Sequence, residues 1–152
     1  ACLVGSEMCI RDSYKELAEK AREIKAGGER FLAQYENEIV DFLREDAEDA
    51  ESRLQKEIFF EFLDNLHGMC HLAEYMGLEV VKEGVLGLDS QGEMTLDGDI
   101  LPLMTEVEVK LYDKEEEQEI WTRTYVAGAK KRYLVGIDRS CPLIGMRARM
   151  RG

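Results

Sequence analysis

The stretch "I-W-T-R-T-Y-V-A-G-A-K-K-R-Y-L-V-G-I", Ile120–Ile137, decides how the C-terminal half of the chain folds. Two runs rich in β-branched and aromatic residues flank a short turn at 127–130 that contains Gly. This pattern predicts a β-hairpin. In the first arm Trp121, Arg123 and Tyr125 share one face, because successive strand residues point to opposite sides. If the two aromatic side chains point into a core, the arginine must point inward with them.

The period-two alternation continues on both sides of the hairpin. Residues 106–112 read E-V-E-V-K-L-Y, with the apolar residues on one side, and residues 146–151 read M-R-A-R-M-R. The stretches at 89–93 and 97–99 have the Asp, Ser and Gly composition of turns. These patterns indicate five or six short strands. We predict a small antiparallel β-barrel of SH3-like or OB-like type across residues 78–152.

The preceding part of the chain has the 3–4 spacing of apolar residues that is typical of amphipathic helices. One such pattern runs from Tyr14 to Phe42, with a weak point at Gly27–Gly28, and a second runs from Leu54 to Met76. The polar segment 44–51 links them, and Asp46 or Asp49 can cap the second helix. We predict an antiparallel helical hairpin over residues 14–77, and therefore an α+β fold.

The first thirteen residues are set apart from this fold. The stretch "M-C-I-R-D-S", Met8–Ser13, resembles the translation of an adapter used in sequencing libraries. The chain also begins at Ala1 rather than at Met, so we expect it to be a fragment with a missing N-terminus. We interpret residues 1–13 as a non-native segment or a disordered tail.

Composition limits the class of protein. The chain has 152 residues, a formal net charge of −12 and 45% hydrophobic residues, values that suit a globular and soluble protein. No apolar run approaches the ~20 residues that cross a bilayer. The four Cys are not spaced as a disulfide framework, which favours a reducing, cytoplasmic location.

The C-terminal part, from about Gly84 to Arg149, resembles a family of uncharacterised small SH3-like domains found on conjugative and other mobile elements of bacteria. The matching positions are Gly98–Asp99, Val107–Leu111, Trp121, Arg123, Tyr133–Leu134–Val135–Gly136, Gly145–Met146, Arg147 and Arg149. The resemblance covers under half of the chain. It implies a fold and a mobile-element setting but no mechanism. The helical hairpin and the acidic loop 113–119 depart from the family's compact form.

The stretch "H-G-M-C-H", His67–His71, is the strongest candidate for metal chemistry. Its two His residues lie four apart, so a helix places them on one side, next to Cys70, and Cys141 could complete a zinc site. The alternative is packing, because the neighbouring apolar residues place this turn on a core helix and a buried Cys behaves as a small hydrophobe. We favour packing. We also find no nucleophile motif and no phosphate loop, and we predict a non-enzyme without metal or cofactor.

Charge is distributed unevenly along the chain. Residues 14–80 and 81–119 each carry a net charge of −9, whereas residues 120–152 carry eight Lys and Arg against one Asp. A nucleic-acid surface is one interpretation, with Tyr125 and Tyr133 as further stacking residues. Its residues would be Trp121, Arg123, Lys130, Lys131, Arg132, Arg147 and Arg149. The alternative is that this basic face docks on the acidic helices or on the loop 113–119, with the aromatic residues in the core.

Apolar stripes without chemistry beside them favour an adaptor function. We predict a non-catalytic interaction protein that binds a partner protein, or itself, through the helical hairpin, while the barrel serves as a platform. The partner-binding residues would be Phe31, Tyr35, Phe42, Leu54, Ile58, Phe62 and Leu66. The second hypothesis is a nucleic-acid-binding accessory protein that uses the basic C-terminal hairpin. A third is an acidic mimic of nucleic acid.

Overall fold

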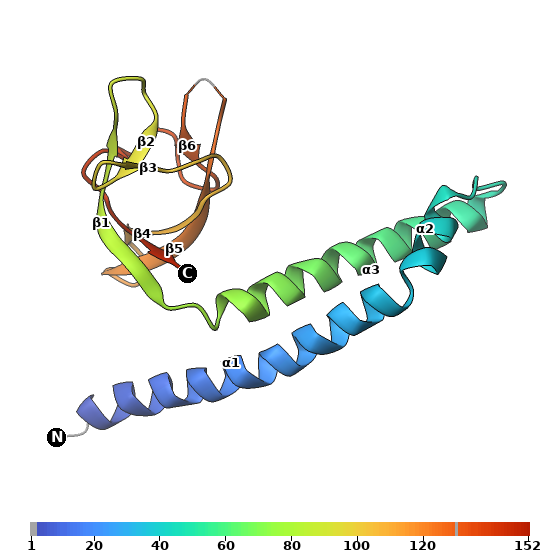
Figure 1. Ribbon diagram of the computed structural model, residues 1–152. Helices are drawn as coiled ribbons and strands as arrows, with labels where there is room; N and C mark the ends of the chain where they lie inside the picture. The colour runs from blue at the N-terminus through green and yellow to red at the C-terminus, as the bar shows by residue number, and fades with distance from the viewer. Residues whose placement is uncertain (1–2, 130) are drawn as a thin grey trace. The chain divides into compact units, whose positions relative to one another are not determined.

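A computed structural model describes residues 3–129 and 131–152, with side chains described from residue 12 onward. The chain divides into two compact units, Ala1–Leu78 and Glu79–Gly152, and each is described here by itself. The first unit is helical and the second is a sheet (Figure 1). The predicted α+β class is therefore confirmed. Among the described residues, no helix is long and apolar enough to cross a membrane.

The described residues of the helical unit form three helices: α1 (Leu3–Gln34), α2 (Glu36–Arg44) and α3 (Ala50–Tyr75). The chain bends at Tyr35, whose φ of −111° and ψ of 20° leave the helical region. The Gly27–Gly28 pair, where we expected the weak point, is instead continuous helix. The backbone of 3–13 belongs to α1 rather than to a tail, while residues 1–2 and the side chains of 1–11 lie outside the described residues.

Helix α3 begins with the cap that the sequence predicts. The Asp49 carboxylate accepts a hydrogen bond from the Ser52 backbone N–H at 2.7 Å. This bond satisfies one of the donors that a helix N-terminus leaves without an intrahelical partner. It also lowers the pKa of Asp49, because it stabilises the charged carboxylate.

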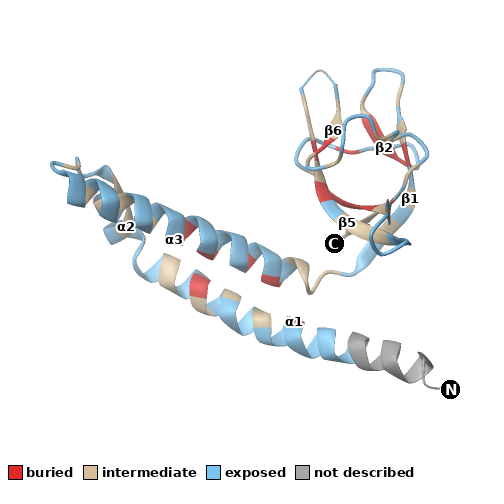
Figure 2. Ribbon diagram, turned by 180° about the vertical axis from the view of Figure 1, so that it is seen from behind, coloured by how far each residue is buried: buried red, intermediate tan, exposed pale blue. Residues whose placement is uncertain are grey.

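Helices α1 and α3 pack antiparallel, as contacts at successive positions show. Lys25 of α1 pairs with Glu74 of α3 at 3.3 Å. Six residues later in α1 the Phe31 ring meets the ring of Phe62, which lies twelve residues before Glu74 in α3, with centroids 5.8 Å apart. Figure 2 shows the buried residues of α3 along the side that faces α1. They are Leu63, Leu66, Cys70 and Ala73. Close approach of the helices is possible because Gly28 has no side chain.

The glycine pair supplies a matched test of that close approach. A Cβ at Gly28 would lie 2.8 Å from the Cys70 Sγ and 2.9 Å from a Leu66 methyl, whereas a Cβ at Gly27 meets nothing within 4 Å. Both Gly→Ala changes gain about 1 kcal/mol of helix propensity, but only Gly28→Ala overpacks the interface. We expect Gly28→Ala to unfold about 1–2 kcal/mol more easily than Gly27→Ala in urea melts followed by circular dichroism. Equal stability of the two variants would contradict the close packing.

In the part of the sheet unit that the structure describes, 79–129 and 131–152, there are seven strands: β1 (Val80–Leu88), β2 (Met94–Leu96), β3 (Asp99–Ile100), β4 (Glu106–Asp113), β5 (Gln118–Ala127), β6 (Tyr133–Leu134) and β7 (Arg147–Arg151). Their order in the sheet is β3-β2-β1-β7-β4-β5-β6, and all pairs are antiparallel. Strands β5 and β6 form the predicted hairpin, although its second arm is shorter than expected. The last strand, β7, pairs with both β1 and β4 and so joins strands β1–β3 to strands β4–β6 in one sheet.

The sheet curls strongly into a half-barrel with its apolar core on the concave side (Figure 1). The core residues are Leu86, Met94, Leu96, Leu101, Val107, Val109, Val126, Leu134 and Ala148. In β5 the inward residues are Thr124 and Val126, so Trp121, Arg123 and Tyr125 point to the convex side. The Thr124 hydroxyl donates to the Val135 carbonyl at 2.7 Å, which satisfies the buried polar group.

Candidate functional site

An exposed apolar stripe runs along α3 beside the face that packs on α1. Its residues are Ile58, Phe62, Asn65, Met69 and Leu72, hereafter the α3 seam, and they follow a 4-3-4-3 spacing. The four apolar members are between 46% and 57% exposed. This spacing is the heptad pattern by which helices pair in coiled coils, and a single Asn in such a pattern fixes register and oligomeric state. The α3 seam therefore has the form of a helix-pairing surface.

Helix α1 adds apolar residues on the same side of the hairpin. Leu17, Ile24 and Phe31 recur every seven residues, and the first two are 62% and 53% exposed. The ring contact between Phe31 and Phe62 places this stripe next to the α3 seam. The α3 seam together with Leu17, Ile24 and Phe31 is called the open apolar face below.

An apolar hollow of about 290 Å³ lies in the same unit. Three of the residues predicted to bind a partner, Phe31, Tyr35 and Phe42, line it together with Ile39 and Phe59. The bend at Tyr35 turns α2 towards α3, and the Phe42 ring meets the Phe59 ring with centroids 5.2 Å apart. The hollow is thus a product of the helix break, which the sequence pattern did not indicate.

The remaining predicted partner-binding residues divide into two kinds. Leu54 is 49% exposed and, like Ile58 and Phe62, is open to a partner. Leu66 is only 8% exposed, because it packs against Gly28 of α1. Its contribution is to hold α1 and α3 together. Sequence reasoning grouped Leu66 with the others because a broad apolar stripe does not reveal which part the neighbouring helix covers.

The convex side of the sheet carries rows of alternating charge. Val107 and Val109 are fully buried, so the intervening Glu108 and its neighbours Glu106 and Lys110 point to the convex side. The same argument holds for the arginines of β7, which alternate with the buried Ala148. Acids of β1 and β4 pair with bases of β7 and β5, and one base of β4, Lys110, pairs with an acid of β5, Glu119, so unlike charges are neighbours across the strands.

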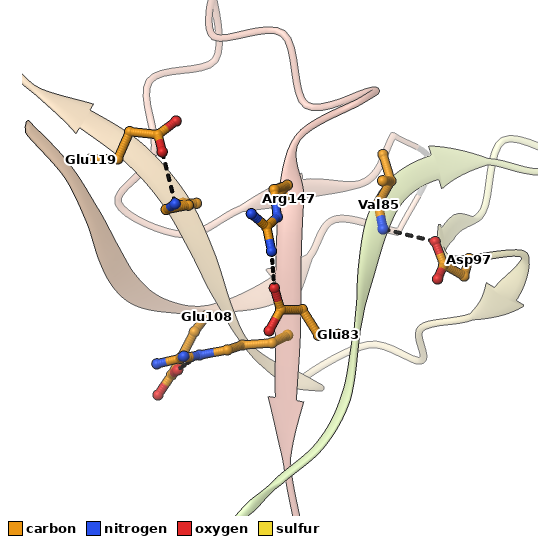
Figure 3. Close-up of polar contacts among 8 residues, drawn as sticks. Glu83, Val85, Asp97, Glu108, Glu119 and Arg147 are labelled. Carbon is orange, nitrogen blue, oxygen red and sulfur yellow. Dashed lines mark hydrogen bonds and ion pairs between the residues drawn. The ribbon is translucent and has the colours of Figure 1, made fainter.

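Glu108 lies at the centre of this network. The residue is 7% exposed and forms ion pairs with Arg149 and, at 2.7 Å, with the Arg151 Nε. On either side, Arg147 pairs with Glu83 and the Arg123 Nε lies 3.6 Å from a Glu106 oxygen. Figure 3 shows the Arg147–Glu83 pair and Glu108 beside an arginine. We call this group of residues the charged network.

Lys110 and Glu119 extend the charged network to the far end of β4 and β5. The ammonium and the carboxylate are 2.7 Å apart, and this hydrogen-bonded contact lowers the pKa of Glu119. The Trp121 ring lies between two cations: the Arg149 guanidinium carbon is 4.1 Å from its centroid and the Lys110 Nζ is 6.0 Å away. The indole face is therefore in contact with cations of the same sheet.

Among the described residues, those predicted to bind nucleic acid do not form one surface of the sheet unit. Trp121, Arg123, Arg147 and Arg149 belong to the charged network on the convex side. Lys131 and Arg132 precede β6, where Arg132 donates to Glu93 at 2.7 Å, and Lys130 lies outside the described residues. The arginines of β7 meet carboxylates of β1 and β4. The segment charges instead predicted partners for this basic face in the helices or in the loop 113–119.

In the stretch His67–His71 the packing interpretation holds for Cys70 but not for the two His residues. The Cys70 thiol is buried against α1, with its Sγ 3.8 Å from the Lys25 carbonyl oxygen, whereas both His side chains are exposed. Cys141 belongs to the other unit. Among the described residues, no group of three or more His, Cys, Asp or Glu is placed to hold a metal ion.

Comparison with known proteins gives no family assignment. No family model, no curated protein and no solved structure matches the chain. The resemblance to SH3-like domains of mobile elements therefore stays a prediction, and function must be argued from the surfaces themselves.

Proposed function

We propose that this chain is a non-catalytic interaction protein that associates with a second copy of itself through the open apolar face of its helical hairpin. The observation that carries the proposal is the α3 seam, where four large apolar side chains about half exposed follow a heptad pattern with one Asn. Monomers rarely leave a long apolar stripe in water without a binding function. The curled sheet, which we interpret as an SH3-like or OB-like barrel, would be the platform.

Charge restricts where a second copy of the chain could dock. Two chains that each carry a net charge of −12 repel each other, so an uncharged stripe is the surface on which they would meet at least cost. None of the five α3 seam residues is charged, although Glu61 and Asp64 lie between them in the sequence. Two antiparallel hairpins joined along such seams form a four-helix bundle, in which apolar positions of facing helices interdigitate. Asn65 would then meet its symmetry mate and fix the register.

Sedimentation of the purified chain tests this function. We expect a concentration-dependent dimer, and we expect Ile58→Lys/Met69→Lys to sediment as a monomer with unchanged helicity, because two buried ammonium groups oppose association. Phe60→Lys is the matched control: Phe60 is also apolar and 53% exposed but lies off the seam, so its dimer should persist. A wild-type monomer at all accessible concentrations, or equal disruption by Phe60→Lys, would overturn the proposal.

The charged network favours this function over the nucleic-acid hypothesis. An arginine already paired with a carboxylate of its own sheet must break that pair before it can neutralise a phosphate. Nucleic-acid binding would instead be supported by DNA affinity at about 50 mM salt that falls steeply with added salt. Such affinity should be lost on charge reversal of Lys131, Arg147 and Arg149.

A further inference from the structure

The sheet unit encloses a cavity of about 350 Å³ on its concave side. Strands β1 and β2 form one wall, and the segment from Lys131 to Ile144 forms the other. The lining is mainly apolar: Leu86, Met94, Leu134, Ile137, Leu143 and Ile144. The first three belong to the buried core, so the cavity reaches from the core to the surface. Its volume is at the lower end of the range for small-molecule sites.

The polar residues around this cavity are mostly cationic. Lys131, Arg132 and Arg139 line it, against the single carboxylate of Asp138. That excess of positive charge occurs in a chain of net charge −12. A locally cationic rim over an apolar interior is the arrangement that recognises an anion attached to an apolar body.

The three cations are held differently. Arg132 donates to Glu93 at 2.7 Å and also to the Gly128 carbonyl, so it ties the residues before β6 to the turn before β2. This pair spans the opening of the half-barrel and fixes the cavity walls. Lys131 is exposed, as is Arg139, whose guanidinium carbon stacks 4.5 Å from the centre of the Tyr133 ring. These two cations are the ones placed to meet a ligand.

Asp138 is committed to its own turn. Its carboxylate accepts hydrogen bonds from the Ser140 backbone N–H at 2.8 Å and from the Ser140 hydroxyl at 2.7 Å. These bonds lower the pKa of Asp138, with the backbone N–H as the larger cause. The turn shapes the segment that carries Arg139 and Cys141 past the cavity, and Cys141 also lines it.

We propose that this cavity binds a small amphipathic anion, a carboxylate with an unbranched or aromatic apolar body, whose charged end lies at Lys131 and Arg139. At the ~30 Å³ that a water molecule takes in the liquid, the cavity holds about a dozen heavy atoms. The apolar body would replace water against Leu134, Ile137 and Leu143, and burial of apolar surface would supply most of the affinity. This site lies in a different unit from the open apolar face and does not depend on the dimer.

Three probes separate the parts of the proposal: octanoate, octan-1-ol and acetate. In ¹H–¹⁵N NMR titrations of the full chain, we expect octanoate to shift the backbone signals of Leu134, Ile137 and Leu143. Octan-1-ol should bind about fivefold more weakly, since it lacks the charge, and acetate should not bind at the same concentrations. Equal affinity for octanoate and octan-1-ol, or shifts confined to the α3 seam, would overturn the proposal.

Charge-reversal variants test the role of the two cations. We expect Lys131→Glu/Arg139→Glu to weaken octanoate binding about tenfold and to leave octan-1-ol unchanged. The control Arg30→Glu/Arg53→Glu makes the same change of net charge on exposed positions of α1 and α3 and should leave both affinities unchanged. An equal effect of the control pair would show that only net charge matters and would refute the site.

The Cys141 thiol gives a readout at the cavity itself. In a Cys2→Ser/Cys9→Ser background the other thiol, Cys70, is buried under α1. We expect saturating octanoate to slow alkylation of Cys141 by iodoacetamide severalfold, whereas acetate does not. An unchanged alkylation rate at an octanoate concentration that saturates the NMR shifts would place the ligand elsewhere and contradict the proposal.

Discussion

Glu108→Gln is expected to lower the free energy of unfolding of the sheet unit by about 3 kcal/mol, because it removes the charge that two arginines share. Glu108 is 7% exposed, and Arg149 and Arg151 approach it from the neighbouring strand. Loss of one member of a buried ion pair costs more than the pair contributes, since the remaining charges stay poorly solvated. Gln can still accept a hydrogen bond, so we place the effect at the lower end of the 3–5 kcal/mol range.

Urea unfolding followed by tryptophan fluorescence measures this effect. Trp121 is the only Trp of the chain and contacts Arg149 of the charged network, so its emission reports on the sheet unit. Glu119→Gln is the matched control: its side chain is 61% exposed in the pair with Lys110, and exposed pairs contribute at most about 1 kcal/mol. If both variants lost the same stability, the charged network would be no more than a set of solvated surface pairs.

A second comparison shows whether the network acts as a unit. Arg149→Met should cost less than Glu108→Gln, because Glu108 keeps Arg151 as a partner and Met preserves apolar contact with Trp121. The double variant should lose less stability than the sum of the two single losses, since both changes remove the same ion pair. Additive losses would show that the two side chains do not interact.

The period-two pattern of the sequence was enough to identify the sheet but not the direction of its faces. Trp121, Arg123 and Tyr125 were correctly grouped on one face, and the open question was whether Arg123 pointed inward with the aromatic residues. The inward face is instead the one with Thr124 and Val126. A Thr-containing face can be the core face because the Thr124 hydroxyl finds a carbonyl acceptor. Which face of β5 packs inward depends on long-range pairing between strands, and no local sequence pattern reveals it.

Counting charges along the sequence also fails to predict which charges are neighbours on the surface of the sheet. Residues 120–152 are basic as a sequence segment, but β7 lies between β1 and β4 in the sheet, and its arginines pair with a carboxylate of each strand, Glu83 and Glu108. Strand order, not sequence order, determines which charges are neighbours. The same limit applies to the cavity, whose two walls come from residues 86–94 and 131–144. The α3 seam, in contrast, is local, but only Ile58 and Phe62 of it were among the predicted partner-binding residues, whereas Asn65, Met69 and Leu72 were not.

Gly84→Ala is expected to cost about 3 kcal/mol of stability, because the space beside Gly84 is already filled. A Cβ there would lie 2.2 Å from an Asp97 carboxylate oxygen and 2.3 Å from its carboxyl carbon. That carboxylate accepts a hydrogen bond from the Val85 backbone N–H at 2.8 Å (Figure 3). The Asp97 backbone N–H in turn donates to the Val85 carbonyl at 3.0 Å. Asp97 thus acts as a strand partner for Val85 at the place where β2 ends.

The turn that holds Asp97 limits how it can respond to the change. Asp97 and Gly98 have φ values of 49° and 87° and connect β2 to β3 as a two-residue turn, the form that favours Asp-Gly. The side chain can only rotate outward, which leaves the Val85 N–H without its charged acceptor at about 1.5–3 kcal/mol. Overpacking adds about 1–3 kcal/mol where the displacement is incomplete.

A double-mutant cycle with Asp97→Gly isolates this contact in the same fluorescence-detected urea melts. Glycine keeps the positive φ of position 97 and removes only the carboxylate. We expect Gly84→Ala to cost less than 1 kcal/mol when Asp97→Gly is already present, because the new methyl group then meets no carboxylate. Gly87→Ala in the same strand is the control: its Cβ would lie 3.1 Å from the Thr95 hydroxyl oxygen, so a smaller loss than that of Gly84→Ala is expected. A full loss for Gly84→Ala in the Asp97→Gly background would mean that Gly84 is required by the strand backbone and not by Asp97.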